Sequence, residues 1–440
     1  MFNTSTLRFP SVLALLLWVI LATGIGFFLA GASYEWQGLV LVPLVIIAAC
    51  FLLPRMSRVD NWSSLLPILT VGLLLRLVFS VTHIWLDSIL WGGLKDAALY
   101  HRGGTAIAQY IWRLEFGQVV PFLQWGTNFI SFFTGIIYSV TGPSLIGAYL
   151  VYGFLAFLGS YFFYRAFRVA FPQGDRRLYA ILVFFFPSFL FWVSGIGKDA
   201  LIFLGIGLFA YGGAQLIRDR LQGFVPLALG LLGVVWIRPH IALVLALAFS
   251  LAFLVRGVGR GSTRPGIFVL GLLAVGGFIW FILPRLTDFL DLNQLSSEEV
   301  LGIFQQHQGL TFTGGSAFTS VDISNPLNFP MAVVTVFFRP FPWEAHNLQA
   351  MVQSLEGVIF MGLVLWRIKS LGRAVLSLIS NTYLRFILLS IIAFIVVFSI
   401  VGNFGILTRQ RTMMLPFFFM LMAYAPLYTR IKDKAQDVAI

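Results

Sequence analysis

Five basic side chains lie where predicted membrane helices end on one side of the bilayer. They are Lys198, Arg238, Arg339, Arg409 and Arg411, with Asp199 and His240 within two residues of the first two. Arginine binds phosphate oxygens through a planar fork and lysine as a point charge, so a lipid phosphate or pyrophosphate suits such a group. Each residue alone fits equally well as a headgroup anchor whose charged end reaches water. Glycine and proline next to several of these residues indicate defined turns, so the set as a whole favours a basic pocket.

A candidate general base, Asp96, lies between the third and fourth apolar runs. Tyr100 and His101 follow it at i+4 and i+5, within a stretch that predicts a helix along the membrane surface. A carboxylate in that place can accept a proton from a hydroxyl group. Asp96 also fits as the N-cap of the same helix, because aspartate is favoured there. Asp87 follows the third apolar run directly, and we interpret it as a marker of the water interface.

The segment from Arg339 to Glu344 contains two prolines, which fix φ and prevent a helix from continuing. Trp343 and Glu344 in this segment are candidate substrate-binding residues, since an indole ring can stack on a sugar. Tryptophans outside the bilayer also form interface belts, which is the commoner role.

Arg76 lies within an apolar run, where a charge is costly, so this residue is a functional candidate. The five histidines lack metal-ligand spacing, so we predict no metal site.

These side chains must be positioned by membrane helices. Of the 440 residues, 59% are hydrophobic and only 10% are charged, whereas soluble chains carry about 25% charged residues. Apolar runs near 20 residues recur, and each can cross about 30 Å of hydrocarbon as a helix. We predict an all-α polytopic bundle of about 12 spans. Their ranges are 11–31, 36–54, 64–84, 144–165, 178–194, 199–217, 222–237, 240–256, 266–283, 351–368, 382–401 and 412–429.

The distribution of charge orients these spans. Most of the 29 basic residues fall in segments that are cytoplasmic if the N-terminus is inside. Both termini are then cytoplasmic, and segments 85–143 and 284–350 are the two large outside loops. A further apolar stretch, 122–140, fits the charge rule only as an interfacial or re-entrant helix. The net charge of +12 follows from the same rule, so the predicted partner is a lipid bilayer and not nucleic acid.

The predicted organisation has four parts. Residues 1–63 form an N-terminal helix pair, and residues 64–283 form a transmembrane core that includes the first outside loop. Residues 284–350 form the second outside loop region, and residues 351–440 form the C-terminal helices.

Several of these features resemble the GT-C superfamily of polytopic membrane glycosyltransferases, which includes relatives of the protein O-mannosyltransferases. The resemblance covers about residues 64–260. It is carried by Leu75-Arg76-Leu77, Asp96 to His101, Thr141-Gly142-Pro143, Arg165, Trp192 to Asp199, and later Arg409 and Arg411. It implies a polyprenyl-phosphate sugar as donor and no cofactor. The sugar would be transferred to a glycan or lipid acceptor on the extracytoplasmic side.

The sequence departs from that family in two places. The large loop follows the third helix instead of the first, and Lys95-Asp96 replaces a paired acidic motif. The long late loop 284–350 is instead similar to O-antigen polymerases and ligases, whose arginines bind lipid pyrophosphates. A polymerase or ligase is therefore the alternative enzyme.

The resemblance implies a glycosyltransferase in the inner (plasma) membrane. Asp96 would be the base, and the five cations would stabilise the leaving phosphate. The alternative from another class is a transporter or flippase of lipid-linked glycans. Transporters place their sites near the midplane, whereas the ionisable residues of this chain gather at one edge.

Overall fold

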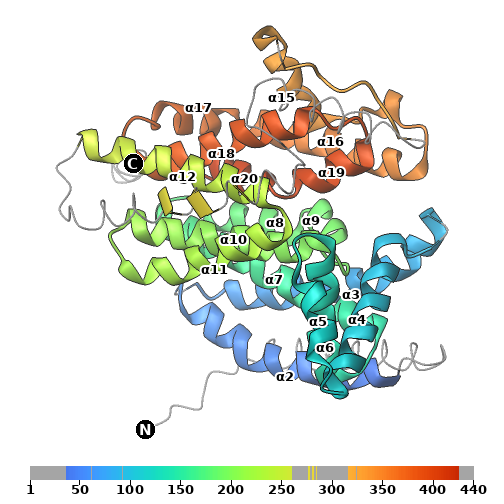
Figure 1. Cartoon of the computed structure of the whole chain (residues 1–440). Helices are drawn as coiled ribbons and strands as arrows, with labels where there is room; N and C mark the ends of the chain where they lie inside the picture. The colour runs from blue at the N-terminus through green and yellow to red at the C-terminus, as the bar shows by residue number, and fades with distance from the viewer. Residues whose placement is uncertain are drawn as a thin grey trace. The chain divides into compact units, whose positions relative to one another are not determined.

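The computed structural model describes residues 36–60, 62–91, 93–259, 316–323 and 325–425, with isolated positions 276, 277, 280, 281 and 284. Within these residues the chain forms 17 α-helices, joined by short 3-10 turns, and contains no β-strand (Figure 1). The prediction of an all-helical fold is confirmed. The predicted first span, 11–31, and most of the ninth, 266–283, lie outside the described residues.

Five described helices are long and apolar enough to cross a membrane. They are α3 (Leu65–Trp91), α7 (Leu145–Ala170), α10 (Lys198–Ile217), α16 (Leu348–Trp366) and α18 (Thr382–Ser399). Shorter apolar helices include α11 (Phe224–Ile237), α12 (Pro239–Gly259) and α15 (Phe329–Phe338). The helices therefore fit a membrane protein, while the number of spans remains a prediction.

The predicted span 178–194 is broken into two helices. The first, α8, covers Arg176–Phe185, and the second, α9, covers Pro187–Trp192. Between them Phe186 is extended, with φ −63° and ψ 129°. Proline has no backbone N–H and its ring clashes with the preceding turn, which explains a helix end at this position. Pro187 then takes the first helical position, where no hydrogen bond is lost.

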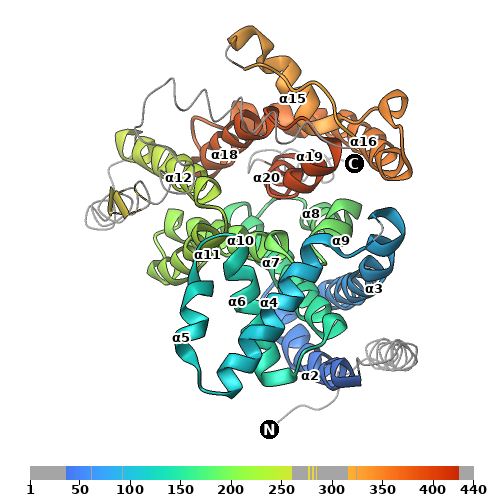
Figure 2. The same cartoon turned by 45° about the vertical axis from the view of Figure 1, so that its right-hand side comes forward.

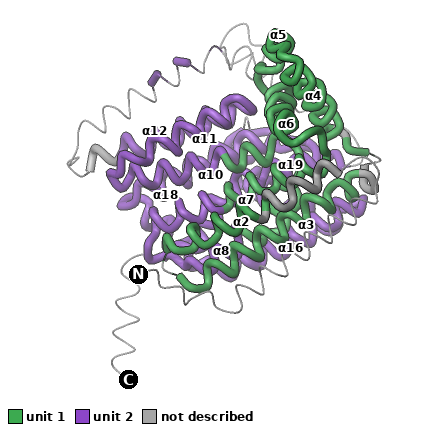
Figure 3. The backbone as a smooth tube through the Cα atoms, turned by 90° about the horizontal axis from the view of Figure 1, so that it is seen from below, with its two compact units in different colours: residues 1–160, 184–204 green, residues 161–183, 205–440 purple. Residues whose placement is uncertain are grey.

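The chain divides into two compact units (Figure 3). Unit 1 comprises residues 1–160 and 184–204, and unit 2 comprises residues 161–183 and 205–440. Helices α7, α8 and α10 each have residues in both units. The four-part organisation predicted from the sequence remains a prediction.

Unit 1 contains α2 (Trp36–Arg58), α3, α9 and a helical hairpin. The hairpin pairs α4 (Lys95–Trp112) with α6 (Thr127–Thr141), joined through α5 (Phe116–Val119), as Figure 2 shows. Gly104 lets α4 approach α6 closely, since a Cβ there would lie 2.7 Å from Thr134 Cγ2. Most of the apolar stretch 122–140, which was predicted to be an interfacial or re-entrant helix, lies in α6, and α6 packs on α4.

Unit 2 is built around a cluster of aromatic side chains. Phe386 of α18 lies 5.6 Å from Phe249 of α12 and 5.5 Å from Phe417, measured between ring centroids. The remaining helices of the unit are α17 (Ile368–Leu376), α19 (Phe404–Arg411) and α20 (Leu415–Met422). Helix α15 packs against α16, α18 and α19 (Figure 1). This packing brings the end of α15, where Arg339 lies, to α19.

Candidate functional site

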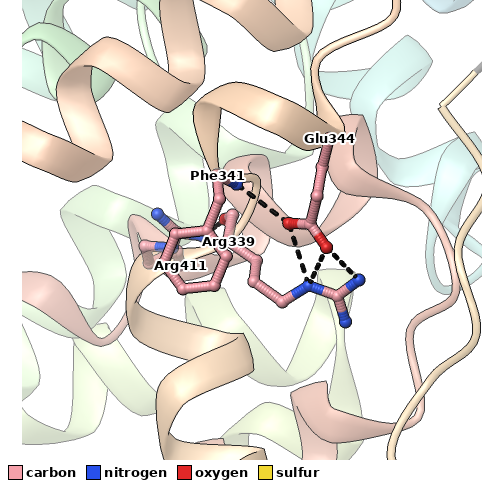
Figure 4. A network of polar contacts seen from close by, with 4 residues as sticks. All are labelled: Arg339, Phe341, Glu344 and Arg411. Carbon is pink, nitrogen blue, oxygen red and sulfur yellow. Dashed lines mark hydrogen bonds and ion pairs between the residues drawn. The ribbon is translucent and has the colours of Figure 1, made fainter.

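An ion pair lies at the end of α15 in unit 2. Arg339 Nη2 lies 2.6 Å from Glu344 Oε1, and Arg339 Nε donates to both carboxylate oxygens at 2.9 and 3.1 Å (Figure 4). The backbone N–H of Phe341 donates to Glu344 Oε2 at 2.9 Å. The prolines at 340 and 342 hold the chain in a tight turn, and the Arg339–Pro340 peptide bond is cis. Glu344 thereby orients the guanidinium group of Arg339.

Two aromatic rings support the same guanidinium group. Arg339 Cζ lies 4.5 Å from the ring centroid of Phe318 and 5.2 Å from that of Phe404. The two rings are stacked on each other, 4.2 Å apart with an interplanar angle of 8°. Backbone hydrogen bonds fix them, from Phe318 N to Gly402 O at 2.8 Å and from Phe404 N to Ser316 O at 3.0 Å. Arg339 is therefore held by cation–π contact as well as by Glu344.

Arg411, at the end of α19, contacts the same turn. Its Nη2 donates to the carbonyl oxygen of Arg339 (Figure 4). Arg411 is only 2% exposed, and its Nε has no hydrogen-bond partner among the described residues. Burial lowers the pKa of Arg411 to about 10, although the nearby charge of Glu356 acts in the opposite direction. At neutral pH Arg411 is still a buried cation.

The charge of Glu344 is favoured by its partners. Partial burial alone would raise the pKa of Glu344, but hydrogen bonds from Arg339 and Phe341 outweigh it. The charges of Arg339 and His346 act in the same direction, and the pKa falls below its ordinary value of 4.5. Glu344 is therefore ionised at neutral pH, and its negative charge is paired with the guanidinium group of Arg339.

The other predicted residues of unit 2 lie on neighbouring elements. Arg238 follows the last residue of α11, and its Nη1 is 3.9 Å from the Sδ atom of Met413, two residues after Arg411. Arg409 is half-buried on α19, His240 is half-buried in the first turn of α12, and Trp343 is exposed and stacks on Phe341 with centroids 4.9 Å apart.

The remaining predicted residues belong to unit 1. Asp96 is exposed in the first turn of α4, where Leu94, and not Asp96, is the N-cap. Tyr100 is buried, and His101 Nδ1 is 2.7 Å from the hydroxyl of Tyr138 on α6. Lys198 and Asp199 open α10, with Lys198 half-buried and Asp199 buried. Whether Lys198 joins the arginines of unit 2 remains a prediction.

A buried polar group in unit 1 was not among the predicted site residues. His83 and Asp87 of α3 pair at 3.2 Å, and the hydroxyl of Tyr149 donates to Asp87 at 3.2 Å. The sequence does carry a signal for it. Arg76, Ser80, His83 and Asp87 are spaced by four, three and four residues, which places them on one face of a helix.

No group of three or more His, Cys, Asp or Glu side chains suited to a metal ion occurs among the described residues. No protein-family model, curated protein or solved structure matches the chain.

Proposed function

We propose that this protein is a membrane glycosyltransferase that uses a polyprenyl-phosphate-linked sugar, with undecaprenyl as the favoured lipid. The acceptor is a glycan or lipid hydroxyl on the extracytoplasmic side. The hydroxyl oxygen attacks the anomeric carbon, its proton passes to a base, for which the sequence predicts Asp96, and the bond from that carbon to the phosphate oxygen breaks. The phosphate leaves with the electron pair, and fixed cations are most effective where such charge develops.

The contact between Arg411 and Arg339 carries this proposal. The two residues are 72 positions apart, and the sequence had singled out both as phosphate ligands. An unpaired nitrogen on a buried guanidinium group is costly, and a phosphate oxygen is one of the charged acceptors that form strong hydrogen bonds with it. Arg411 Nε supplies such a nitrogen. Arg339 is rigidly held beside it, so little side-chain entropy is lost on binding.

The proposal includes a topology in the inner (plasma) membrane. About 12 spans would place both termini in the cytoplasm and segments 85–143 and 284–350 outside. Arg339 falls in the second of these segments, and Arg411 falls between the last two predicted spans, so both are placed on the outside. A donor phosphate at the outer headgroup level would then meet both residues.

The test is transfer and donor binding by the purified protein in nanodiscs, with a panel of undecaprenyl-phosphate hexoses. We expect Arg411→Lys to keep the charge but lose the planar fork. Hydrogen bonds to charged groups contribute about 1.5–3 kcal/mol, so donor binding should weaken by about 10- to 150-fold. The control is Arg373→Lys on α17, where Nε donates to the carbonyl oxygen of Lys369 in an exposed bond. Equal donor binding by both variants, or no transfer by the wild type, would refute the proposal.

One observation favours a polysaccharide polymerase or ligase as the second candidate. Arg339 comes from the late segment 284–350, whose length prompted that alternative, and it contacts Arg411. A pyrophosphate carries more charge than a monophosphate and makes fuller use of two arginines. Transfer from undecaprenyl-pyrophosphate oligosaccharides, with none from undecaprenyl-phosphate hexoses, would select this candidate.

A further inference from the structure

Helix α16 lies beside the two arginines of the candidate site in unit 2. It packs against α15, which leads into the turn at Arg339, and against α19, which ends at Arg411 (Figure 1). A Cβ at Gly357 of α16 would lie 2.8 Å from the carbonyl oxygen of Phe338, the residue before Arg339. The charge of Glu356, next to Gly357, acts on Arg411. This part of α16 is therefore close to both arginines.

Gln353 lies one helical turn before Gly357, on the same face of α16. One turn further back on this face is Gln349, whose Nε2 would be 3.2 Å from a Cβ at Gly405 of α19. Gln353 thus lies between a position of α16 that contacts α19 and a position that contacts the end of α15. Its side chain is on the side of the helix that faces the candidate site.

The amide group of Gln353 is buried, and neither Nε2 nor Oε1 has a hydrogen-bond partner among the described residues. A buried polar group without a partner is costly, so it calls for an explanation. The neighbouring Ser354 shows the usual arrangement, since its hydroxyl donates to the carbonyl of Met351 at 2.8 Å. Together with Arg411 Nε, the described part of the site thus offers two nitrogen donors and one oxygen acceptor that the protein itself does not use.

A sugar joined to a phosphate has the groups that these atoms need. The guanidinium group of Arg411 suits an anionic phosphate oxygen. The amide of Gln353 presents a donor and an acceptor side by side. Two adjacent hydroxyls of a sugar are complementary to it, because one can accept from Nε2 while the other donates to Oε1. A site built to hydrogen-bond hydroxyls also rejects a ligand without them, since its own polar groups then stay unpaired.

We propose that Gln353 is the sugar-binding residue of the donor site, and that its amide holds two adjacent hydroxyls of the hexose whose phosphate Arg411 binds. This inference rests on the proposed function and names the part of the donor that the arginines do not recognise. Binding then depends on the sugar as well as on the phosphate. The undecaprenyl phosphate left after transfer lacks the hexose, so it binds more weakly than the donor and is released.

The test measures binding in nanodiscs of two probes, undecaprenyl phosphate and the tightest-binding undecaprenyl-phosphate hexose of the panel. Gln353→Met keeps the length of the side chain and removes both the donor and the acceptor. Two hydrogen bonds are lost, so we expect binding of the hexose probe to weaken about 5- to 150-fold. Binding of undecaprenyl phosphate should not change. Arg411→Lys should weaken binding of both probes, because both contain the phosphate.

Ser354→Ala is the matched control on the same helix, because its hydroxyl is already paired within α16. We expect this variant to bind both probes as the wild type does. Wild-type binding of the hexose probe by Gln353→Met, or equal weakening of both probes, would overturn the role of Gln353. The proposed function would still stand if Arg411→Lys weakened binding of both probes.

A comparison within the wild type decides the case if Gln353→Met does not fold. The hexose probe should bind at least about 5-fold more tightly than undecaprenyl phosphate, since the amide adds two hydrogen bonds to the sugar. Equal binding of the two probes would overturn the inference and leave the phosphate site standing. Binding of neither probe by the wild type would overturn both.

Discussion

At the residue scale, burial distinguishes two carboxylates of unit 1, Asp87 and Asp96. The sequence favours Asp96, because Tyr100 and His101 follow it on a predicted helix. In the fold Asp96 is exposed, while Asp87 is buried between His83 and Tyr149. Tyr149 is 62 residues from Asp87, and no local pattern reveals such a contact. The role of Asp96 as general base remains a prediction.

The arginines were easier to find from the sequence. Arg339 and Arg411 stand out because cations are rare in segments predicted to be outside. Their mutual contact depends on the packing of α15 against α19, which the sequence does not encode locally. The stacking of Phe318 on Phe404 beneath Arg339 is equally non-local.

Glu344 gives a pH dependence whose direction follows from its lowered pKa. A depressed folded pKa means that the ionised carboxylate stabilises the fold fully above the unfolded pKa of about 4.5. The contribution is lost as pH falls through the lower folded pKa. We expect the wild type to melt above Glu344→Gln at pH 7 and the difference in Tm to shrink below about pH 4.5. Thermal unfolding in detergent at several pH values measures this, and a difference that grows on acidification would contradict it.

At the element scale, the bounds of two continuous apolar helices agree closely with the predicted spans, whereas a break within another span was not predicted. The bounds of α10 and α18 differ by one or two residues from the predicted spans. The apolar run 178–194 gave no hydrophobic signal of a break, yet Pro187 divides it. Two adjacent glycines in a sequence are consistent with a flexible link or with close helix packing. Gly103 and Gly104 lie inside α4 against α6, so here they permit close packing, which only their neighbours in the fold reveal.

The hairpin of α4 and α6 yields a packing prediction. Gly104→Ala would place a Cβ 2.7 Å from Thr134 Cγ2 and 3.2 Å from the backbone of Gly135. Overpacking of this kind costs about 1–3 kcal/mol. We expect a lower Tm for Gly104→Ala and none of this loss for Gly117→Ala, because nothing lies within 4 Å of a Cβ at Gly117. Equal Tm values for the two variants would mean that α4 and α6 are not packed this closely.

At the scale of the whole molecule, composition alone predicts a helical membrane protein, because 59% hydrophobic residues leave too few polar groups for a soluble surface. The division into two units was beyond the sequence. The boundary passes within α7, α8 and α10, and hydropathy does not change there. Function was beyond composition too, since headgroup anchors and phosphate ligands use the same arginines.

The orientation of the chain can be tested with single cysteines introduced at charged, exposed positions. Cys50 is the one native cysteine, so Cys50→Ser provides the background. Ser370 lies on the predicted cytoplasmic side but is unsuitable as a probe, because it is buried and donates to the carbonyl of Tyr424. Lys369, next to it, is exposed, and Asp322 is exposed in the segment predicted to be outside.

We expect an impermeant maleimide to label Asp322→Cys in intact cells and Lys369→Cys only after lysis. The reason is the excess of arginine and lysine in the segments assigned to the cytoplasm, which sets orientation during insertion. Glu115→Cys and Arg58→Cys, both at exposed positions, repeat the comparison for the first outside loop and an earlier cytoplasmic turn. Labelling of Lys369→Cys from outside would show that the late helices have the opposite orientation to the predicted one. Arg339 and Arg411 would then face the cytoplasm, and the proposal of transfer on the extracytoplasmic side would lose its basis.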